Sequence, residues 1–528
     1  MRQVRSVSRR QFLTAVGHTA GSNAMLRAAA VLGAGAGAAA CDESTVDPFG
    51  HSPRPEDWPG DVGRGRTVAI LGAGLAGMSA ALELTRLGFE CTLLEAREAA
   101  GGRTRTLRAG DVASEFDAEQ TCAFDADPRL YFNAGPSRIP HHHELLLGYC
   151  REFGVPLETF TNDNRAARLH DPRQFGGAPQ IARRLRADFR GQVAALLATA
   201  IDRGALDQEL TAADRARLVG ALGSFGDLDA SARFGGSERA GFPGQDRAGS
   251  RERGTSLDPR PLSSWLDDGF WMARVAFTEG LDQQSTMLQP VGGMDQIAKA
   301  FQTQIEPSLT LGAVITALRK RSEGVTVEYE QAGAARELQA DFGLVTLPAP
   351  VLAGLTTDFS AEARREIGGF QYTSAVRIAF QAPRFWERNH NIYGGISWTN
   401  QAITQIWYPN HDFGAEQGVV LGAYSFGGAA GDGLTAQPPP QRLTTAVNQA
   451  SAVHPEFATE ASRGISVAWK NVPFQRGGWG VSTPDVLLQP DDRYYFAGEH
   501  LSRLQGWQEG AILSAYRAVD GIVSAVSS

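Results

Sequence analysis

Three glycines and one glutamate near the start of the chain have the types and spacing that hold a phosphate and a ribose. Gly72, Gly74 and Gly77 form a G-x-G-x-x-G pattern directly after an apolar run, and Glu95 ends the next apolar run. Glycines at these places permit a tight turn, close approach of the backbone to a pyrophosphate and close packing of a helix. The acid accepts a hydrogen bond from a ribose hydroxyl and disfavours a 2′-phosphate. The pattern predicts a dinucleotide site.

One βαβ unit has to position these residues. Residues 67–71 are a short apolar run typical of a buried parallel strand, residues 75–87 predict a helix, and residues 89–94 predict the second strand. The N-terminus of that helix then faces the phosphate charge. A glycine turn without a ligand is the alternative for the three glycines alone, and the elements around them argue against it.

Two further motifs give the chain a resemblance to the flavin-containing amine oxidase family. In Gly101-Gly102-Arg103, two glycines leave room for the backbone, and the guanidinium can bind a phosphate through two hydrogen bonds. Residues 494–500 read YYFAGEH, and residues 506–511 read GWQEGA. In the family, this second region returns the chain to the nucleotide domain, places an acid beside the sugar chain of the flavin and begins a helix under its ring. The resemblance covers roughly residues 65–525 and implies FAD.

The resemblance also implies where the cofactor is held. Residues 290–294 resemble the P-x-G-G-M segment that brings the chain back to the FAD domain, and a valine at the place of Val314 contacts the adenine through its backbone. None of Cys41, Cys91, Cys122 and Cys150 lies in the C-terminal motif, where relatives with covalent flavin carry a thiol, so we expect non-covalent FAD. The expected cofactor residues are Gly72, Gly74, Ala76, Gly77, Glu95, Ala96, Arg97, Gly102, Arg103, Gly135, Pro136, Ser137, Arg138, Val314, Gly498, Glu499, Gly506, Trp507 and Gln508.

The segment NAGPSRIP at residues 133–140 bears on the substrate. It resembles a segment of the L-amino acid oxidases in which the arginine, here Arg138, holds the α-carboxylate of the substrate. A planar guanidinium suits that task because it binds a carboxylate through two parallel hydrogen bonds. A structural salt bridge or a phosphate contact is the alternative for Arg138.

Further pocket residues are expected from other parts of the chain. Tyr408 is the candidate phenol for the same carboxylate, with Trp407 on the opposite face of the strand, and a one-residue slip would exchange the two. By resemblance, the carbonyl of Gly506 helps to hold the substrate amine and Trp507 forms a wall. Residues 265–279 are expected to be the helical segment that supplies specificity.

The chain departs from the family at Arg377, where relatives usually carry a lysine that holds a water at the flavin and helps oxygen to react. We expect Arg377 to be the catalytic counterpart, because its charge would favour negative charge beside the reduced flavin. An outward-facing strand arginine is the alternative.

The resemblance therefore implies an FAD-dependent L-amino acid oxidase, which converts L-amino acids and O2 to 2-oxo acids, ammonia and hydrogen peroxide. Three alternatives are an L-amino acid 2-monooxygenase giving amide and CO2, an amine or polyamine oxidase, and a secreted binding or scaffold protein that keeps FAD without turnover.

Composition limits the other partners. A formal net charge of −8 and spread basic residues argue against nucleic acid. The cysteine spacing indicates no metal site, and His141 to His143 are expected to be surface or helix-start residues because successive helical residues diverge. We expect a homo-oligomer, a dimer.

The N-terminus predicts export. Residues 8–13, SRRQFL, match the twin-arginine signal, and a weakly apolar run ends before Cys41. A periplasmic or extracellular location follows, with Cys41 as an alternative lipid-modified N-terminus. No later run of eighteen strongly apolar residues predicts a membrane span.

The sequence predicts an α/β protein, α+β overall, with a Rossmann-like FAD-binding domain, a mixed-sheet substrate domain and a helical insertion. Helices are expected at 181–200 and 212–222, and strands at 311–315, 325–329, 343–347, 376–380, 403–407 and 419–424. The expected order is a signal peptide (1–41), a linker (42–65), the first part of the FAD domain (66–140), a helical domain (141–285) with a mobile loop (223–259), the second FAD part with the start of the substrate domain (286–355), the substrate-binding domain (356–485) and the C-terminal FAD part (486–528). In some secreted relatives such a loop is cut during maturation.

Overall fold

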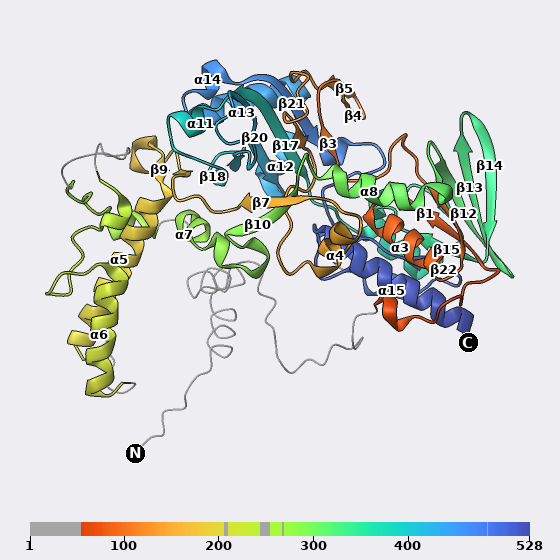
Figure 1. The fold of residues 1–528 in the computed structure, drawn as a ribbon, viewed down its shortest axis with the longest axis horizontal. Coiled ribbons are helices and arrows are strands. Elements are labelled where there is room, and N and C mark those ends of the chain that lie inside the picture. The colour runs from red at the N-terminus through yellow and green to blue at the C-terminus, as the bar shows by residue number, and fades with distance from the viewer. Residues whose placement is uncertain (1–53, 205–209, 243–253, 267–268, 483, 528) are drawn as a thin grey trace. The chain divides into compact units, whose positions relative to one another are not determined.

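The computed structural model describes residues 54–204, 210–242, 254–266, 269–482 and 484–527 (Figure 1). The predicted twin-arginine segment and Cys41 lie outside these residues. The described chain divides into two units: the larger contains residues up to 160, 286–385 and 402–527, and the smaller contains residues 161–285 and 386–401. No described helix has an 18-residue stretch apolar enough to cross a membrane.

A five-stranded parallel sheet forms the centre of the larger unit. The strand order is β11 (Leu309–Thr310), β2 (Glu90–Leu94), β1 (Thr67–Leu71), β15 (Phe342–Val345) and β22 (Tyr494–Phe496). The apolar runs predicted at 67–71, 89–94 and 343–347 are these buried strands. Helices α3 (Leu75–Arg86) and α15 (Gln508–Ser527) lie side by side on the sheet, with α4 (Glu144–Glu152) against α15 and α8 (Asp295–Ile305) against α3 (Figure 1). This is the Rossmann-like domain that the sequence predicts.

Directly after β11, the chain forms a separate antiparallel sheet. It consists of β12 (Val314–Arg321), β13 (Gly324–Gln331) and β14 (Ala334–Ala340), with the short β16 (Thr356–Thr357) pairing with β12. The strand predicted at 311–315 is wrong in its bounds, because Gly312, at a φ of +66°, turns the chain between β11 and β12.

A second sheet in the larger unit carries residues of the predicted substrate site. Its central strand β17 (Ala375–Pro383) pairs with β20 (Gln417–Phe426) and β21 (Ser462–Ala468), and β20 also pairs with β19 (Gln405–Trp407). The register places Arg377 opposite Tyr424. Helices α12 (Gly428–Thr435) and α13 (Pro439–Ser451) pack on this sheet. The remaining elements of the larger unit are the pairs β3 (Thr106–Leu107) with β6 (Phe132–Asn133), β4 (Val112–Glu115) with β5 (Ala118–Thr121), and β7 (Leu157–Thr161) with β10 (Thr286–Pro290), and the short helices α9 (Ala349–Leu352), α10 (Ala361–Gly369) and α14 (Phe457–Glu460).

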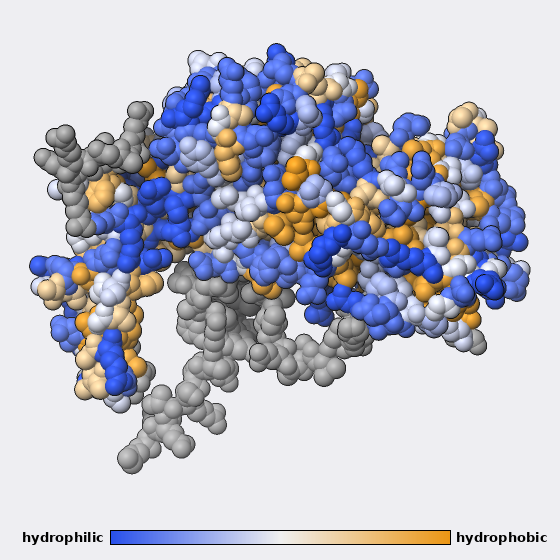
Figure 2. Space-filling view, in the orientation of Figure 1, coloured by the Kyte–Doolittle hydropathy of each residue, from blue (hydrophilic) through white to orange (hydrophobic). Residues whose placement is uncertain are grey.

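Two long helices, α5 (Ala182–Asp202) and α6 (Ala212–Gly226), dominate the smaller unit, as predicted. They share a small core of Ala194, Ala198, Ile201 and Leu222. Figure 2 shows apolar side chains among charged ones along these helices, and Leu196 and Phe225 are exposed. This unit also contains β8 (Arg168–His170), which pairs with β9 (Gln180–Ile181) and β18 (Ile396–Thr399), and α7 (Phe270–Val275); α11 (Phe385–Arg388) spans the boundary between the units.

Two predictions for the smaller unit are wrong in part. The loop predicted at 223–259 begins later, because α6 continues to Gly226, and Leu228 and Ala232 pack against the α5–α6 core. The helix predicted at 265–279 is interrupted: α7 begins only after Gly269, which has a φ of +77° that ordinary helical residues do not adopt.

Candidate active site

The turn between β1 and α3 contains two glycines, Gly72 and Gly77, that a larger residue could replace only with strain or displacement. A Cβ on Gly77 would lie 2.0 Å from the Gly72 carbonyl oxygen, and Gly72 has a φ of +101°. A Cβ on Gly74 would meet nothing within 4 Å, so the backbone at the start of α3 is open on that side. Ala76 is buried in the first turn of the same helix. This is the arrangement that a pyrophosphate at a helix N-terminus requires.

Glu95 lies at the end of β2 with its carboxylate fixed beside this turn. Its Oε2 accepts from the Ala73 N–H at 2.9 Å, and its Oε1 accepts from the Arg97 N–H at 3.0 Å. A carboxylate accepts about four hydrogen bonds, so lone pairs are left for a ribose hydroxyl. The Glu95 carbonyl accepts from the Ala313 N–H at 2.8 Å, which brings Val314, the next residue, to the same end of the site.

The two distant motifs meet through Arg103. Its Nη1 donates to Glu499 Oε1 at 2.8 Å and to the Gly478 carbonyl at 2.6 Å. Sequence reasoning assigned Arg103 to a phosphate, whereas the structure pairs it with Glu499. The other oxygen of Glu499 accepts from the Gly506 N–H at 2.9 Å, so this carboxylate also fixes the turn before α15.

Close contacts hold the remaining cofactor segments together. Arg97 donates to the Gly102 carbonyl at 2.9 Å, and a Cβ on Gly102 would lie 3.1 Å from the Gly74 Cα. A Cβ on Gly135 would lie 1.8 Å from the Arg103 carbonyl oxygen. The other predicted members of this group, Ala96, Pro136, Gly498 and Gln508, lie in the same segments, and Gln508 donates to Thr104 at 3.0 Å.

Arg138 lies among aromatic rings. Its Cζ is 4.5 Å from the centroid of the Trp407 ring and 6.0 Å from that of Trp507. Removal from solvent lowers the pKa of Arg138 to about 9, the nearby Arg377 cation acts in the same direction, and Tyr424 opposes the change. The guanidinium remains positively charged at neutral pH. A cation held against π faces in this way is suited to a carboxylate ligand.

The assignment of Tyr408 is corrected by the structure. Tyr408 is buried, and its hydroxyl lies 2.5 Å from Nε2 of His454. Trp407, its neighbour on the strand, is the residue that contacts Arg138, so the two have the exchanged roles that a slip of one residue produces. Trp407 has no hydroxyl, and its indole N–H donates to Gln405.

Tyr424 is a tyrosine of the site that sequence reasoning did not single out. It lies on β20, its ring contacts that of Trp407 at 5.3 Å, and the Arg377 Cζ lies 4.1 Å from its centroid. In the sequence it is one of several alternating residues of a strand, and only its register opposite Arg377 identifies it.

Arg377 faces inward rather than outward. Its side chain is 5% exposed, and Nη1 donates to the Asn133 carbonyl at 3.0 Å and to the Ser137 hydroxyl. Burial lowers the pKa of Arg377, and Tyr424 opposes that change. Arg377 thus shares Trp407 and Tyr424 with the surroundings of Arg138.

Gly506 and Trp507 form another wall. Gly506 has a φ of +76°, and a Cβ there would lie 3.2 Å from the Trp479 ring, which makes Trp479 a second residue that sequence reasoning missed. The ring of His143 lies edge-on to Trp507 at 5.1 Å. His143 is 1% exposed, so its assignment to the surface is wrong although it does precede helix α4; its burial lowers its pKa to about 3.

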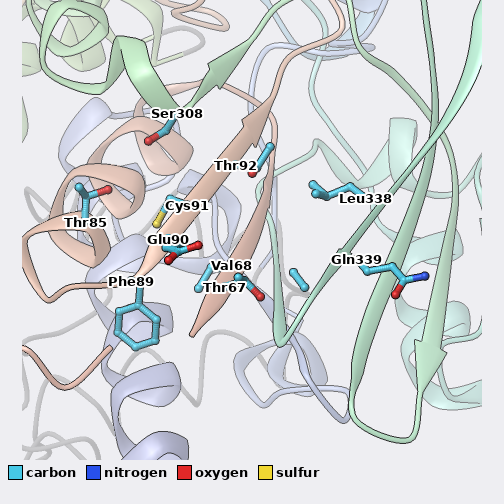
Figure 3. A pocket seen from close by; sticks show the side chains of 11 residues that line it. Thr67, Val68, Thr85, Phe89, Glu90, Cys91, Thr92, Ser308, Leu338 and Gln339 are labelled. Atoms are coloured by element: carbon cyan, nitrogen blue, oxygen red, sulfur yellow. The ribbon is translucent and has the colours of Figure 1, made fainter. Parts of the chain in front are cut away.

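A separate cavity of about 400 Å³ lies at the other end of the parallel strands (Figure 3). It is lined by the paired first residues of β1 and β2, with Thr85, Ser308 and the end of β14 around it. The glycine turn follows the opposite, carboxyl ends of these strands, so this cavity is not part of the site described above.

Comparisons with known proteins agree with this geometry. The family described as flavin containing amine oxidoreductase matches residues 75–523. A flavin-dependent L-tryptophan oxidase, RebO, of Lentzea aerocolonigenes is 29% identical over 87% of this chain and 98% of that protein. An L-amino-acid oxidase of Gloydius halys is 27% identical over 85% of this chain and 88% of that protein. The structure of a cyclohexylamine oxidase from Brevibacterium oxydans has a TM-score of 0.56 at 16% identity, covers 88% of this chain and 100% of that one, and shows the same fold.

Proposed function

Because the chain belongs to the flavin-containing amine oxidoreductase family, we propose that it is an L-amino acid oxidase that uses non-covalently bound FAD. The observation that carries the proposal is Arg138, a cation held against Trp407 and Trp507 beside the phenol-bearing residue Tyr424. An amine without a carboxylate would not need this guanidinium, whereas an amino acid does. The similarity to curated amino acid oxidases supports the same substrate class.

The residues of the cofactor site fit FAD. Gly72 and Gly77 form the turn for a pyrophosphate, the open side of Gly74 leaves room for it, and Glu95 retains lone pairs for a ribose. When bound, the flavin would supply the redox chemistry, accepting the two electrons of the Cα–H bond of the substrate as a hydride and passing them to O2, while the amine loses a proton. The described cysteines, Cys91, Cys122 and Cys150, lie outside the C-terminal motif, which supports non-covalent binding.

The substrate residues would bind and orient rather than act as strong bases. Arg138 would hold the α-carboxylate through paired hydrogen bonds, and the Tyr424 hydroxyl would add another. The Gly506 carbonyl, exposed at a positive-φ turn, would accept from the substrate amine, and Trp507 would exclude water from one side. Orientation of the Cα–H bond by these contacts is the contribution of the protein to the rate.

Arg377 is proposed to act in the oxidative half of the cycle. A buried guanidinium favours negative charge that develops as reduced flavin transfers electrons to O2. Arg377→Met should therefore slow reoxidation much more than reduction by a neutral amino acid. Stopped-flow measurement of the two half-reactions separates these effects, and an unchanged oxygen rate contradicts this role.

The experiment that tests the proposed function is a peroxide screen of purified holoenzyme with the twenty L-amino acids and several D-isomers. Turnover of L-amino acids with formation of 2-oxo acid, ammonia and peroxide is expected. Amide and CO2 would identify a monooxygenase, and oxidation only of the decarboxylated amine an amine oxidase. If no amino acid reduces the flavin in the absence of oxygen, the protein would be a non-catalytic binding protein.

We further propose twin-arginine export to the periplasm or the cell exterior, and a homodimer as the functional form. The export proposal rests on residues 8–13, and its alternative end product is a lipid-anchored protein modified at Cys41. Light scattering of the purified holoenzyme gives the oligomeric state directly.

A further inference from the structure

Arg377 is a second buried cation next to Arg138. The two guanidinium carbons lie 5.1 Å and 4.5 Å from the centroid of the same indole, that of Trp407. Arg377 also stacks on Tyr424 at 4.1 Å. The chain thus places two positive groups around one pair of aromatic side chains.

No carboxylate of the described residues neutralises Arg377. It donates to the Asn133 carbonyl and to the Ser137 hydroxyl, it is hydrogen-bonded to the Tyr424 side chain, and it lies over the Trp407 ring. Within the described part of the chain, no Asp or Glu forms an ion pair with it. The buried Arg442 of the larger unit, in contrast, is neutralised: it binds both oxygens of Glu115, at 2.5 and 2.6 Å. The partly buried Arg103 likewise binds Glu499 at 2.8 Å.

A buried cation without a counter-charge is unfavourable, because desolvation costs several kcal/mol that hydrogen bonds to neutral groups recover only in part. Replacement by an apolar side chain of similar volume would remove that cost. The presence of an arginine at this buried position is therefore explained best by a ligand whose negative charge offsets the cost of desolvation. The ring of oxidised flavin is neutral, its pyrophosphate is assigned to the glycine turn, and the α-carboxylate is assigned to Arg138. An anion for Arg377 in the reductive half-reaction would therefore come from the side chain of the substrate.

We propose that Arg377 binds a second carboxylate, that of the side chain of an acidic L-amino acid, while Arg138 binds the α-carboxylate. This inference rests on the proposed function and names its substrate class: dicarboxylic L-amino acids such as glutamate and aspartate. Guanidinium groups on one indole are close enough for the two ends of such a short molecule. The oxidative role of Arg377 concerns the later reaction of the reduced enzyme with O2, so flavin reduction measured without O2 reports on the first role alone.

The test compares substrates that differ only in charge. Anaerobic flavin reduction is measured with L-glutamate against L-glutamine, and with L-aspartate against L-asparagine. The wild-type holoenzyme should favour the acid over its amide by about 10-fold or more, as a charge-assisted contact predicts. Arg377→Met should lower this ratio by about 10- to 100-fold, because the lost contact affects the acid and not its amide.

The matched control is Arg463→Met, the same change on the neighbouring strand β21 at an exposed arginine that pairs with Asp125. This control should keep the wild-type ratio. A second measurement requires no variant: in wild-type holoenzyme, glutarate should shift the flavin spectrum at a concentration at least about 10-fold lower than butyrate does.

Two results would overturn the inference while the proposed function stands. One is flavin reduction by amino acids with an acid-to-amide ratio near one in the wild type; the other is a ratio that Arg377→Met leaves unchanged. If no L-amino acid reduces the flavin, the proposed function itself fails, and that outcome is distinguishable from both.

Discussion

Cations and aromatic rings alternate through the substrate end of the site. Tyr424 contacts Arg377, both Arg377 and Arg138 contact Trp407, and Arg138 also faces Trp507. π faces stabilise a guanidinium without occupying its N–H donors in the way that a carboxylate does. The arrangement therefore keeps positive charge in a largely desolvated place, as the proposed binding of a carboxylate requires.

Removal of the guanidinium at Arg138 should show its role directly. Arg138→Met removes at least one charge-assisted hydrogen bond, worth about 1.5 to 3 kcal/mol, so kcat/KM for amino acids should fall by about one to two powers of ten. Arg138→Lys should recover only part, because a point charge does not reproduce two parallel hydrogen bonds. Steady-state kinetics check this, and wild-type values in the Met variant would contradict the carboxylate assignment.

Two tyrosines provide a matched pair. Tyr424→Phe should lower kcat/KM for amino acids several-fold and hardly change the melting temperature, because Tyr424 lies beside Arg377 at the site. Tyr408→Phe should lower the melting temperature and leave kcat/KM nearly unchanged, because the Tyr408 hydroxyl forms a buried hydrogen bond with His454 worth about 1 kcal/mol. Kinetics and thermal unfolding of both variants decide, and a kinetic loss confined to Tyr408→Phe would restore the sequence-based assignment.

The pair also shows what the sequence could not provide at this scale. Arg138, Gly506 and Trp507, which the resemblance assigns to the substrate, could be identified from the sequence because each lies in a contiguous motif. Which face of a strand a residue occupies depends on the partner strand, and a shift of one residue inverts it. The sequence therefore could not decide which of Tyr408 and Trp407 faces Arg138. The position of Tyr424 opposite Arg377 follows only from the pairing of β17 with β20.

At the scale of elements, buried parallel strands were predictable because both of their faces are apolar. β1 has the predicted bounds, and β2 and β15 differ by one or two residues. The errors follow from backbone breaks that composition does not reveal. Gly269 interrupts the helix expected at 265–279, and Gly312 delays the strand expected at 311–315. The polar composition after residue 223 suggested a loop, yet α6 continues to Gly226.

The glycine turn gives a prediction for one such element. In Gly77→Ala, the new methyl would lie 2.0 Å from the Gly72 carbonyl oxygen, so the turn between β1 and α3 has to open. The ratio of flavin absorbance to protein absorbance in the purified variant should fall well below that of the wild type. Gly220→Ala in α6 is the control, since a methyl there meets nothing within 4 Å and should stabilise the helix by about 0.5 to 1 kcal/mol. A fully loaded Gly77→Ala enzyme would contradict the assigned role of the turn.

At the scale of the whole molecule, buried histidines tie stability to pH. Burial lowers the pKa of His143 to about 3 and that of His500 to about 4, from an ordinary value of 6.5. Between these values the unfolded chain binds protons that the folded chain does not. The contribution of each buried, neutral histidine to the free energy of unfolding is therefore complete above pH 6.5. Below that pH it decreases by about 1.4 kcal/mol per pH unit, until the pKa of the folded state is reached.

This linkage predicts a melting temperature that falls on acidification from pH 7 to pH 5. His143→Phe should reduce the fall, because phenylalanine keeps an aromatic ring beside Trp507 and does not titrate. Thermal unfolding of both proteins across this pH range is the measurement. A wild-type melting temperature independent of pH, or an identical fall in the variant, would contradict the linkage to His143.

The proposed export is the other whole-molecule prediction, and it rests on residues outside the described structure. The twin-arginine route carries folded proteins, which suits a chain that has to acquire FAD in the cytoplasm before it leaves. Replacement of Arg9 and Arg10 by lysine should leave active holoenzyme in the cytoplasm, and the same change at Arg2 and Arg5 should not. Fractionation with an activity assay distinguishes the two variants. Unchanged export of the Arg9→Lys, Arg10→Lys protein would rule out this route.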